Sequence, residues 1–159
     1  MTKDINFINQ TKALIDNLKA VCANYGLGND GNEFKIITQV FLYKFMNDKF
    51  RYEAKKHDKK LAKAENFQQA VEALSDDEYK FLLKRIGPSI PKLYPNEMIS
   101  NLYNQQNKDD FAVLFDGTLR NISINNTEIF SVKSASGAKD KMFDELSQFI
   151  SDASQRDAF

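Results

Sequence analysis

Apolar residues recur every three or four positions along most of this chain, which predicts a mainly α-helical protein. The first such stretch spans residues 3–24 and ends at a group of glycines, so we expect an amphipathic helix there. Its apolar positions are Ile5, Ile8, Leu14, Ile15, Leu18, Val21 and Cys22. Near the end of this helix, Cys22 is expected to be a small buried apolar residue.

The stretch from residue 31 to residue 65 is apolar in its first half and basic in its second. One face of the predicted helix carries Phe34, Ile37, Phe41 and Phe45, and Ile36, Val40 and Phe50 widen it. Because apolar residues cover most of its circumference, we expect this half to be a central, buried helix. A narrower stripe follows at helical spacing (Ala54, His57, Leu61 and Ala64), so the same helix is expected to continue into solvent.

The middle of the chain contains two further helix signals around a proline-rich segment. Ser75 and Glu78 have the spacing of a capping box, in which each side chain binds the backbone amide of the other residue. The helix that they start is expected to end at Gly87, and Pro88, Pro91 and Pro95 then favour a stiff, extended connector. A short helix is expected from Pro95 to Tyr103.

The last third of the chain is predicted to be helical with one interruption. Phe111, Leu114, Phe115, Leu119 and Ile122 have helical spacing. Residues 128–142 contain a Gly-bearing turn between two short segments, which we interpret as either a small β-hairpin or a loop. A final helix is expected at Phe143 to Ile150. The predicted fold is therefore a mainly α multi-helix bundle with a small β-hairpin near residues 128–142.

Composition limits the classes of function that fit this chain. With 159 residues, 42 % of them hydrophobic, it fits a single helical domain over residues 1–159. Its 22 basic and 22 acidic residues balance, so the overall charge does not attract nucleic acid, and only a local cluster of basic residues could bind it. The single cysteine excludes a disulfide framework within the chain, and neither a secretory leader nor a stretch apolar enough for a membrane is present. We therefore expect a cytoplasmic protein with no membrane association.

A glycine motif at residues 26–31 matches G-x-G-x-x-G. In a dinucleotide site, the first of these glycines follows a β-strand, whereas the segment before Gly26 has a helical pattern. We interpret the motif as a turn between two helices, in which the glycines, together with Asn29 and Asp30, adopt positive φ.

Five lysines, with four-residue spacings that place them on one face of a continuous helix, are the candidate nucleic-acid site. They are Lys55, Lys56, Lys59, Lys60 and Lys63. Such a face can neutralise successive phosphates of duplex DNA, with strong salt dependence and little base preference. A solvated helix surface would have the same pattern, so both interpretations stay open.

No catalytic or metal site can be assembled from the sequence. His57 is the only histidine and has no second histidine to share a metal ion, so a structural role is expected for it. No G-x-S-x-G segment supplies a nucleophile. We therefore predict no catalytic, cofactor-binding or metal-binding residues in this chain.

Two segments of the chain resemble a known family. Residues 18–25 and 32–53, which include the phrase Lys44-Phe45-Met46-Asn47-Asp48-Lys49-Phe50, resemble the opening of the modification subunits of type I restriction-modification systems. These are adenine-specific DNA methyltransferases of the N-6 methylase family. The segment from Asp109 to Ser131 resembles the part of such subunits that precedes the catalytic domain.

The resemblance implies a role without catalysis for this chain. The family's [DN]-P-P-[YF] loop, which holds the flipped adenine, has no counterpart here because the sequence contains no Pro-Pro pair. The catalytic domain and its S-adenosylmethionine site would follow this region in a full-length subunit and are absent from the chain. The implied partners are a specificity subunit, a second modification subunit, a restriction subunit and double-stranded DNA.

The function implied by the resemblance is subunit assembly and DNA clamping by a non-catalytic N-terminal domain. The alternative from another class is a free-standing helical interaction or regulatory module that binds a protein and has no DNA role. Salt dependence separates the two, because a lysine–phosphate interface weakens steeply with salt and an apolar protein interface does not.

Overall fold

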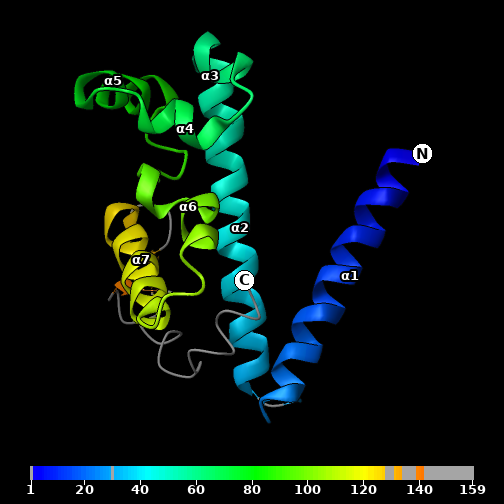
Figure 1. Ribbon diagram of the computed structural model, residues 1–159. Coiled ribbons are helices and arrows are strands. Elements are labelled where there is room, and N and C mark those ends of the chain that lie inside the picture. Colours follow the sequence, from blue (N-terminus) through cyan, green and yellow to red (C-terminus); the bar gives the residue numbers. More distant parts are fainter. Residues whose placement is uncertain (1, 30, 128–130, 134–138, 142–159) are drawn as a thin grey trace.

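The computed structural model describes residues 2–29, 31–127, 131–133 and 139–141. Helices dominate these residues, which confirms the predicted mainly α fold (Figure 1). The helix predicted at Phe143 to Ile150 lies outside the described residues. The elements in chain order are α1 (Thr2–Asn24), α2 (Gly31–His57), α3 (Lys59–Lys63), α4 (Phe67–Glu72), α5 (Asp76–Ile86), the 3₁₀ turn η1 (Pro95–Glu97), α6 (Ile99–Asn104), α7 (Phe111–Asn125), β1 (Ser131–Lys133) and β2 (Lys139–Lys141).

The long helix α2 is the axis of the structure (Figure 1). Helices α4 to α7 lie on one side of it, while α1 leaves the turn at its base and diverges from it on the other side. A single cluster of buried side chains joins α2 to α3–α7. Its members are Tyr43, Met46, Phe50, Ala54, Leu61, Phe67, Val71, Tyr79, Leu82, Ile86, Leu93, Met98, Leu102, Phe111, Phe115, Leu119 and Ile122.

The face of α2 that the sequence predicted to be buried is not the one that packs on the core. Phe34 is 73 % exposed and Phe45 is 61 % exposed, so this part of the prediction was wrong. The buried face carries Tyr43 and Met46, together with Ile36 and Phe50 from the residues that were predicted to widen the apolar face. Because α2 is apolar around most of its circumference, its periodicity cannot indicate which side will face the other helices.

The turn between α1 and α2 confirms that the glycine motif connects two helices, but of its described residues only Gly26 and Asn29 have a positive φ, and Asp30 lies outside the described residues. A helix precedes it, and Gly26 has φ +74° while Asn29 has φ +59°. Gly28 is needed for close packing of the turn against α1, because a Cβ atom there would lie only 3.2 Å from the Cα of Ala23. The motif therefore folds as a helix–helix connection and presents no strand end to a phosphate.

The prediction of helices beyond residue 64 was correct for the long elements and incomplete for the short ones. The capping box of α5 is present, with the Ser75 amide donating to Glu78 Oε2 at 2.9 Å. The six-residue helix α4, capped by Asn66, was not predicted. The single helix expected from Pro95 is divided at Met98, whose backbone is extended (φ −76°, ψ 148°), into η1 and α6.

Side chains from several helices hold the proline-rich segment at the centre of the fold. Two tyrosines donate to its carbonyl groups, Tyr43 to Glu97 O and Tyr79 to Leu93 O. Three side-chain amides contact it as well. Gln68 Nε2 donates to Pro95 O (2.8 Å), Asn47 Oδ1 accepts from the Ile99 amide (3.1 Å), and Asn126 binds both the amide and the carbonyl of Lys92. After a turn at residues 88–90, the connector runs without helix or strand as far as η1, and side chains bind several of its polar backbone groups.

Two short strands pair in the stretch where the sequence left hairpin and loop open. Strands β1 and β2 are antiparallel, with Ser131 opposite Lys141 and Lys133 opposite Lys139.

Among the helices of the described residues, none combines the length and the apolarity needed to cross a bilayer.

Candidate nucleic-acid interface

The lysine-rich segment does not form the continuous helix that the sequence predicted. Helix α2 ends at His57, and Asp58 adopts an extended conformation (φ −132°, ψ 117°) before α3 begins. The Asp58 carboxylate accepts hydrogen bonds from the amides of Lys60 (2.7 Å) and Leu61 (3.0 Å), so it caps a new helix. The Leu61 side chain is fully buried and packs α3 against the core.

This break divides the five candidate lysines between two helices. Lys55 and Lys56 lie in the last turn of α2, and Lys59, Lys60 and Lys63 lie on α3. The expected single helical face with regular four-residue spacing is therefore wrong. The lysines still share one region, because α3 follows α2 directly at the end opposite the α1–α2 turn (Figure 1).

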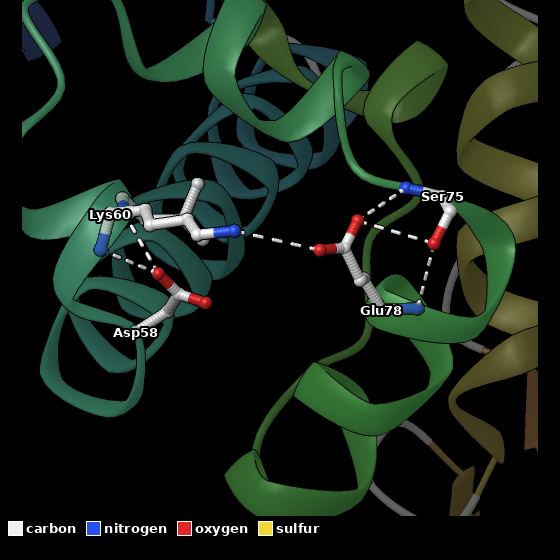
Figure 2. Close-up of polar contacts among 5 residues, drawn as sticks. Asp58, Lys60, Ser75 and Glu78 are labelled. Atoms are coloured by element: carbon white, nitrogen blue, oxygen red, sulfur yellow. Dashed lines mark hydrogen bonds and ion pairs between the residues drawn. The ribbon is translucent and has the colours of Figure 1, made fainter.

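Three of the lysines contact other groups of the chain. Lys55 Nζ lies 5.7 Å from the centre of the Phe67 ring, and Lys56 Nζ lies 3.8 Å from Glu53 Oε2. Lys60 Nζ lies 3.6 Å from Glu78 Oε1, which connects α3 to the capping box of α5 (Figure 2). The Lys56 and Lys60 side chains stay largely exposed, and pairs of this kind contribute little stability, so a phosphate can compete for them.

Lys59 and Lys63 are the members of the cluster best suited to meet a phosphate. Both are exposed, and no ion pair is formed by either within the described part of the chain. They are four residues apart on α3, so they project from the same side of that helix.

Glu53 is a centre of charge contacts that sequence reasoning missed. Its carboxylate lies 3.1 Å from Lys49 Nζ and 3.7 Å from His57 Nε2, in addition to Lys56. The hydrogen bond from Lys49, together with the nearby positive charges, holds the pKa of Glu53 below its ordinary value. The spacings of three and four residues on one helix were the signal that could have revealed this group. His57 accordingly has a structural position beside a carboxylate.

Acidic residues lie next to the lysine cluster and reduce its positive electrostatic potential. The first turn of α5 contains Asp76, Asp77 and Glu78. Hydrogen bonds from the backbone and hydroxyl of Ser75, together with Lys60, keep the pKa of Glu78 below its ordinary value. Glu78 is therefore ionised at neutral pH, and it offsets part of the positive charge on the side that faces α5.

A polar cavity of about 500 Å³ lies beside the cluster, between α2, α4 and α6. Its walls include Arg51, whose guanidinium lies 5.1 Å from the centre of the Phe67 ring, and Gln68. Gln68 Nε2 donates to Glu72 and to Pro95 O, so its Oε1 faces the other way and has no partner among the described residues. The cavity offers groups for hydrogen bonding, among them the side chains of Asp48 and Glu72.

No metal site is formed in the part of the chain that the structure describes, since no three His, Cys, Asp or Glu side chains gather there.

Comparison with known proteins does not assign the chain, because no family model, curated protein or solved structure matches it.

Proposed function

We propose that this chain is the non-catalytic N-terminal domain of the modification subunit of a type I restriction-modification system, and that it contributes to subunit assembly and DNA clamping. The observation that carries the proposal is the concentration of Lys55, Lys56, Lys59, Lys60 and Lys63 at one end of α2 in a chain of zero net charge. A local cluster in a neutral chain gives one end of the domain a positive field.

The sequence phrase that carries the family resemblance has a clear structural purpose, which supports the proposal. It lies in the middle of α2, where Met46 and Phe50 are fully buried. Asn47 is buried as well, and its Oδ1 accepts a hydrogen bond from the Ile99 amide at 3.1 Å. On the exposed side, Lys44 and Asp48 form an ion pair of 2.7 Å. The phrase therefore fixes the position of the α2 axis against the connector and α6.

The geometry of the cluster indicates how DNA would bind. The last turn of α2 and the short helix α3, separated by the extended residue Asp58, carry the cations on neighbouring turns, so they would contact the phosphate backbone and leave the bases unread. In a full-length subunit, S-adenosylmethionine and the methyl-transfer chemistry would belong to the catalytic domain. The partners would be the specificity subunit, a second modification subunit and the restriction subunit, with double-stranded DNA between them.

Charge reversal on α3 tests this proposal. The variant Lys59→Glu/Lys63→Glu changes two exposed residues that make no ion pair within the described residues, so the fold should persist. Binding to a fluorescein-labelled duplex is measured by anisotropy over a series of KCl concentrations. We expect the slope of log K against log[salt] to become shallower by about 2, since each lost phosphate contact removes about 1.

A matched control separates a local contact from a change in net charge. Lys80→Glu/Lys84→Glu has the same four-residue spacing, the same change of charge and the same exposed setting, but on α5. Equal losses of affinity in the two variants, or no DNA affinity of the unaltered chain at low salt, would contradict a DNA contact through α3. Transfer of a methyl group from S-adenosylmethionine by this chain alone would contradict the non-catalytic role.

A helical protein-interaction or regulatory module with no DNA role is the second candidate, and one observation favours it. Helices α1 and α2 expose large apolar side chains, among them Phe7, Ile8, Phe34 and Phe45. Exposed apolar surface of this kind marks interaction sites. Under this candidate, partner binding would persist at high salt, and the lysine variants would bind the partner as the unaltered chain does.

A further inference from the structure

The apolar face of α1 is buried at one end of the helix and exposed at the other. Leu18 and Cys22, close to the turn, are each 2 % exposed against α2. Ile8 and Phe7, about three to four turns earlier on the same side of the helix, are 61 % and 69 % exposed. The change follows from geometry, because α1 diverges from α2 toward its N-terminal end (Figure 1).

The divergence leaves an apolar wedge between the two helices. A groove of about 660 Å³ is lined by residues of both, including Phe7 and Leu14 from α1 and Phe41 and Phe45 from α2. A second hollow of about 460 Å³ continues it toward the turn and shares Phe41 and Phe45. The wedge ends at Lys44, Asp48 and Lys49, and two ion pairs, Lys44 with Asp48 (2.7 Å) and Lys49 with Glu53 (3.1 Å), leave this edge nearly neutral.

We infer that a second copy of this chain occupies the wedge, with the α1 helices of two copies exchanged about a twofold axis. Each copy carries both complementary parts, namely a protruding apolar end at Phe7 and Ile8 and an open apolar wedge at Phe41 and Phe45. A twofold arrangement covers both parts in both copies at once, whereas a monomer leaves them exposed. The chain has zero net charge, so two copies do not repel each other at long range.

The available area is sufficient for a specific dimer. Phe7, Phe34 and Phe45 are 61–73 % exposed and Ile8 is 61 % exposed. Phe34 lies seven and eleven residues before Phe41 and Phe45, so it extends the same side of α2 beyond the two hollows. Since a fully exposed aromatic side chain offers roughly 150–250 Å², Phe7, Phe34, Phe45 and the smaller Ile8 together present on the order of 500 Å² in each copy. Covering them in both copies buries about 1,000 Å², which reaches the lower limit for a specific interface. Leu14, Ile37 and Phe41, which are partly exposed, enlarge the surface.

This pairing goes beyond the proposed DNA contact and does not depend on it. The wedge lies between α1 and α2, while the candidate lysines lie at the end of α2 and on α3. The experiments therefore contain no DNA, and a failure of the pairing leaves the test of DNA binding unaffected.

The first experiment measures mass in solution by light scattering after gel filtration. We expect the chain, of 18.2 kDa, to elute as a dimer at tens of micromolar, and Phe45→Glu to elute as a monomer. The matched control is Phe81→Glu on α5, because Phe81 is also 61 % exposed, and it should leave the dimer intact. A monomeric unaltered chain at 200 µM, or a dimer that survives both Phe7→Glu and Phe45→Glu, would overturn the inference.

A cross-linking experiment then tests the exchange itself. Chains carrying Phe7→Cys are mixed with chains carrying Phe45→Cys and oxidised, and the disulfide product is identified by mass. Burial raises the pKa of the Cys22 thiol, so this background cysteine should react poorly. We expect a cross-linked dimer that contains one chain of each kind. Cross-linking that occurs only inside a single chain carrying both substitutions would show that α1 closes on its own α2 and would overturn the exchange.

Discussion

Asn126 gives the clearest test of how the connector is held, because its side chain makes three hydrogen bonds. Its Nδ2 donates to Lys92 O and to Ile122 O, both at 2.8 Å, and its Oδ1 accepts from the Lys92 amide at 2.6 Å. The side chain is buried, with 4 % of the residue exposed. The Asn126 side chain thus joins the end of α7 to the connector by binding both the amide and the carbonyl of one residue, as a neighbouring β-strand would.

The expected cost of removing this side chain follows from these contacts. Each hydrogen bond contributes about 0.5–1.5 kcal/mol, and Asn126→Ala leaves the amide and carbonyl of Lys92 without a partner, so we expect a loss of about 2–3 kcal/mol in the free energy of unfolding. Asn126→Asp should be worse than the alanine variant. It keeps the acceptor but directs a carboxylate at two carbonyl oxygens, and an unpaired buried charge costs more than a missing side chain.

Urea denaturation followed by circular dichroism at 222 nm measures these differences. For a chain of this size, a loss of about 2–3 kcal/mol corresponds to a fall in Tm of roughly 5–10 °C. Asn125, the exposed neighbour, supplies the controls, because Asn125→Ala removes an equal side chain and Asn125→Asp places a carboxylate at the same helix end. The reasoning is refuted if Asn126→Ala lies within 0.5 kcal/mol of Asn125→Ala, or if Asn126→Asp is as stable as Asn126→Ala.

Three further predictions concern single polar groups. Asp58→Ala removes the cap of α3 and should lower the free energy of unfolding by about 1 kcal/mol, whereas Asp58→Asn, which keeps the capping oxygen, should restore most of it in the same urea assay. Ser75→Ala should cost about 1 kcal/mol and raise the pKa of Glu78 toward its ordinary value, because the Ser75 hydroxyl helps to hold that pKa low; an NMR titration of the Glu78 carboxyl that is unchanged in the variant would contradict this. Burial raises the pKa of Glu97, so the folded state disfavours its carboxylate, and stability is lost as the pH rises from the ordinary carboxyl range through the raised pKa. Thermal melts should therefore show Glu97→Gln gaining stability relative to the unaltered chain between pH 4 and pH 7.5, and a difference that does not change with pH would contradict the assignment.

Local signals in the sequence predicted the elements that local chemistry determines. Helices α1 and α7 have a single apolar stripe, and α5 has both a capping box and a terminating Gly87, so each could be located from neighbouring residues alone. Helix α4 has six residues, fewer than two full turns, which is too short for a periodic pattern to be recognised.

Tertiary contacts decided what the sequence could not show. Asp58 breaks the lysine-rich helix because Leu61 gains full burial when α3 turns onto the core, and the periodic stripe contained no sign of this. The buried face of α2 was predicted wrongly because the helices that cover it are distant in sequence. The candidate lysines were identified by composition, and the i,i+3 spacing of Glu53 and Lys56 could be read from the sequence, but the division of the cluster and the partners Phe67 and Glu78 depend on the folded arrangement.

The way the connector is held has a consequence for how the chain folds. Its contacts join residues far apart in sequence, with separations of 54 for Tyr43 and Glu97, 52 for Asn47 and Ile99, and 34 for Asn126 and Lys92. Helical proteins usually fold fast because their contacts are local, whereas contacts of long separation require loops to close first. We therefore expect the individual helices to form early and the docking of residues 92–99 to limit the folding rate. A chain shortened before Asn126 should lose its cooperative unfolding transition while keeping much of its helical content.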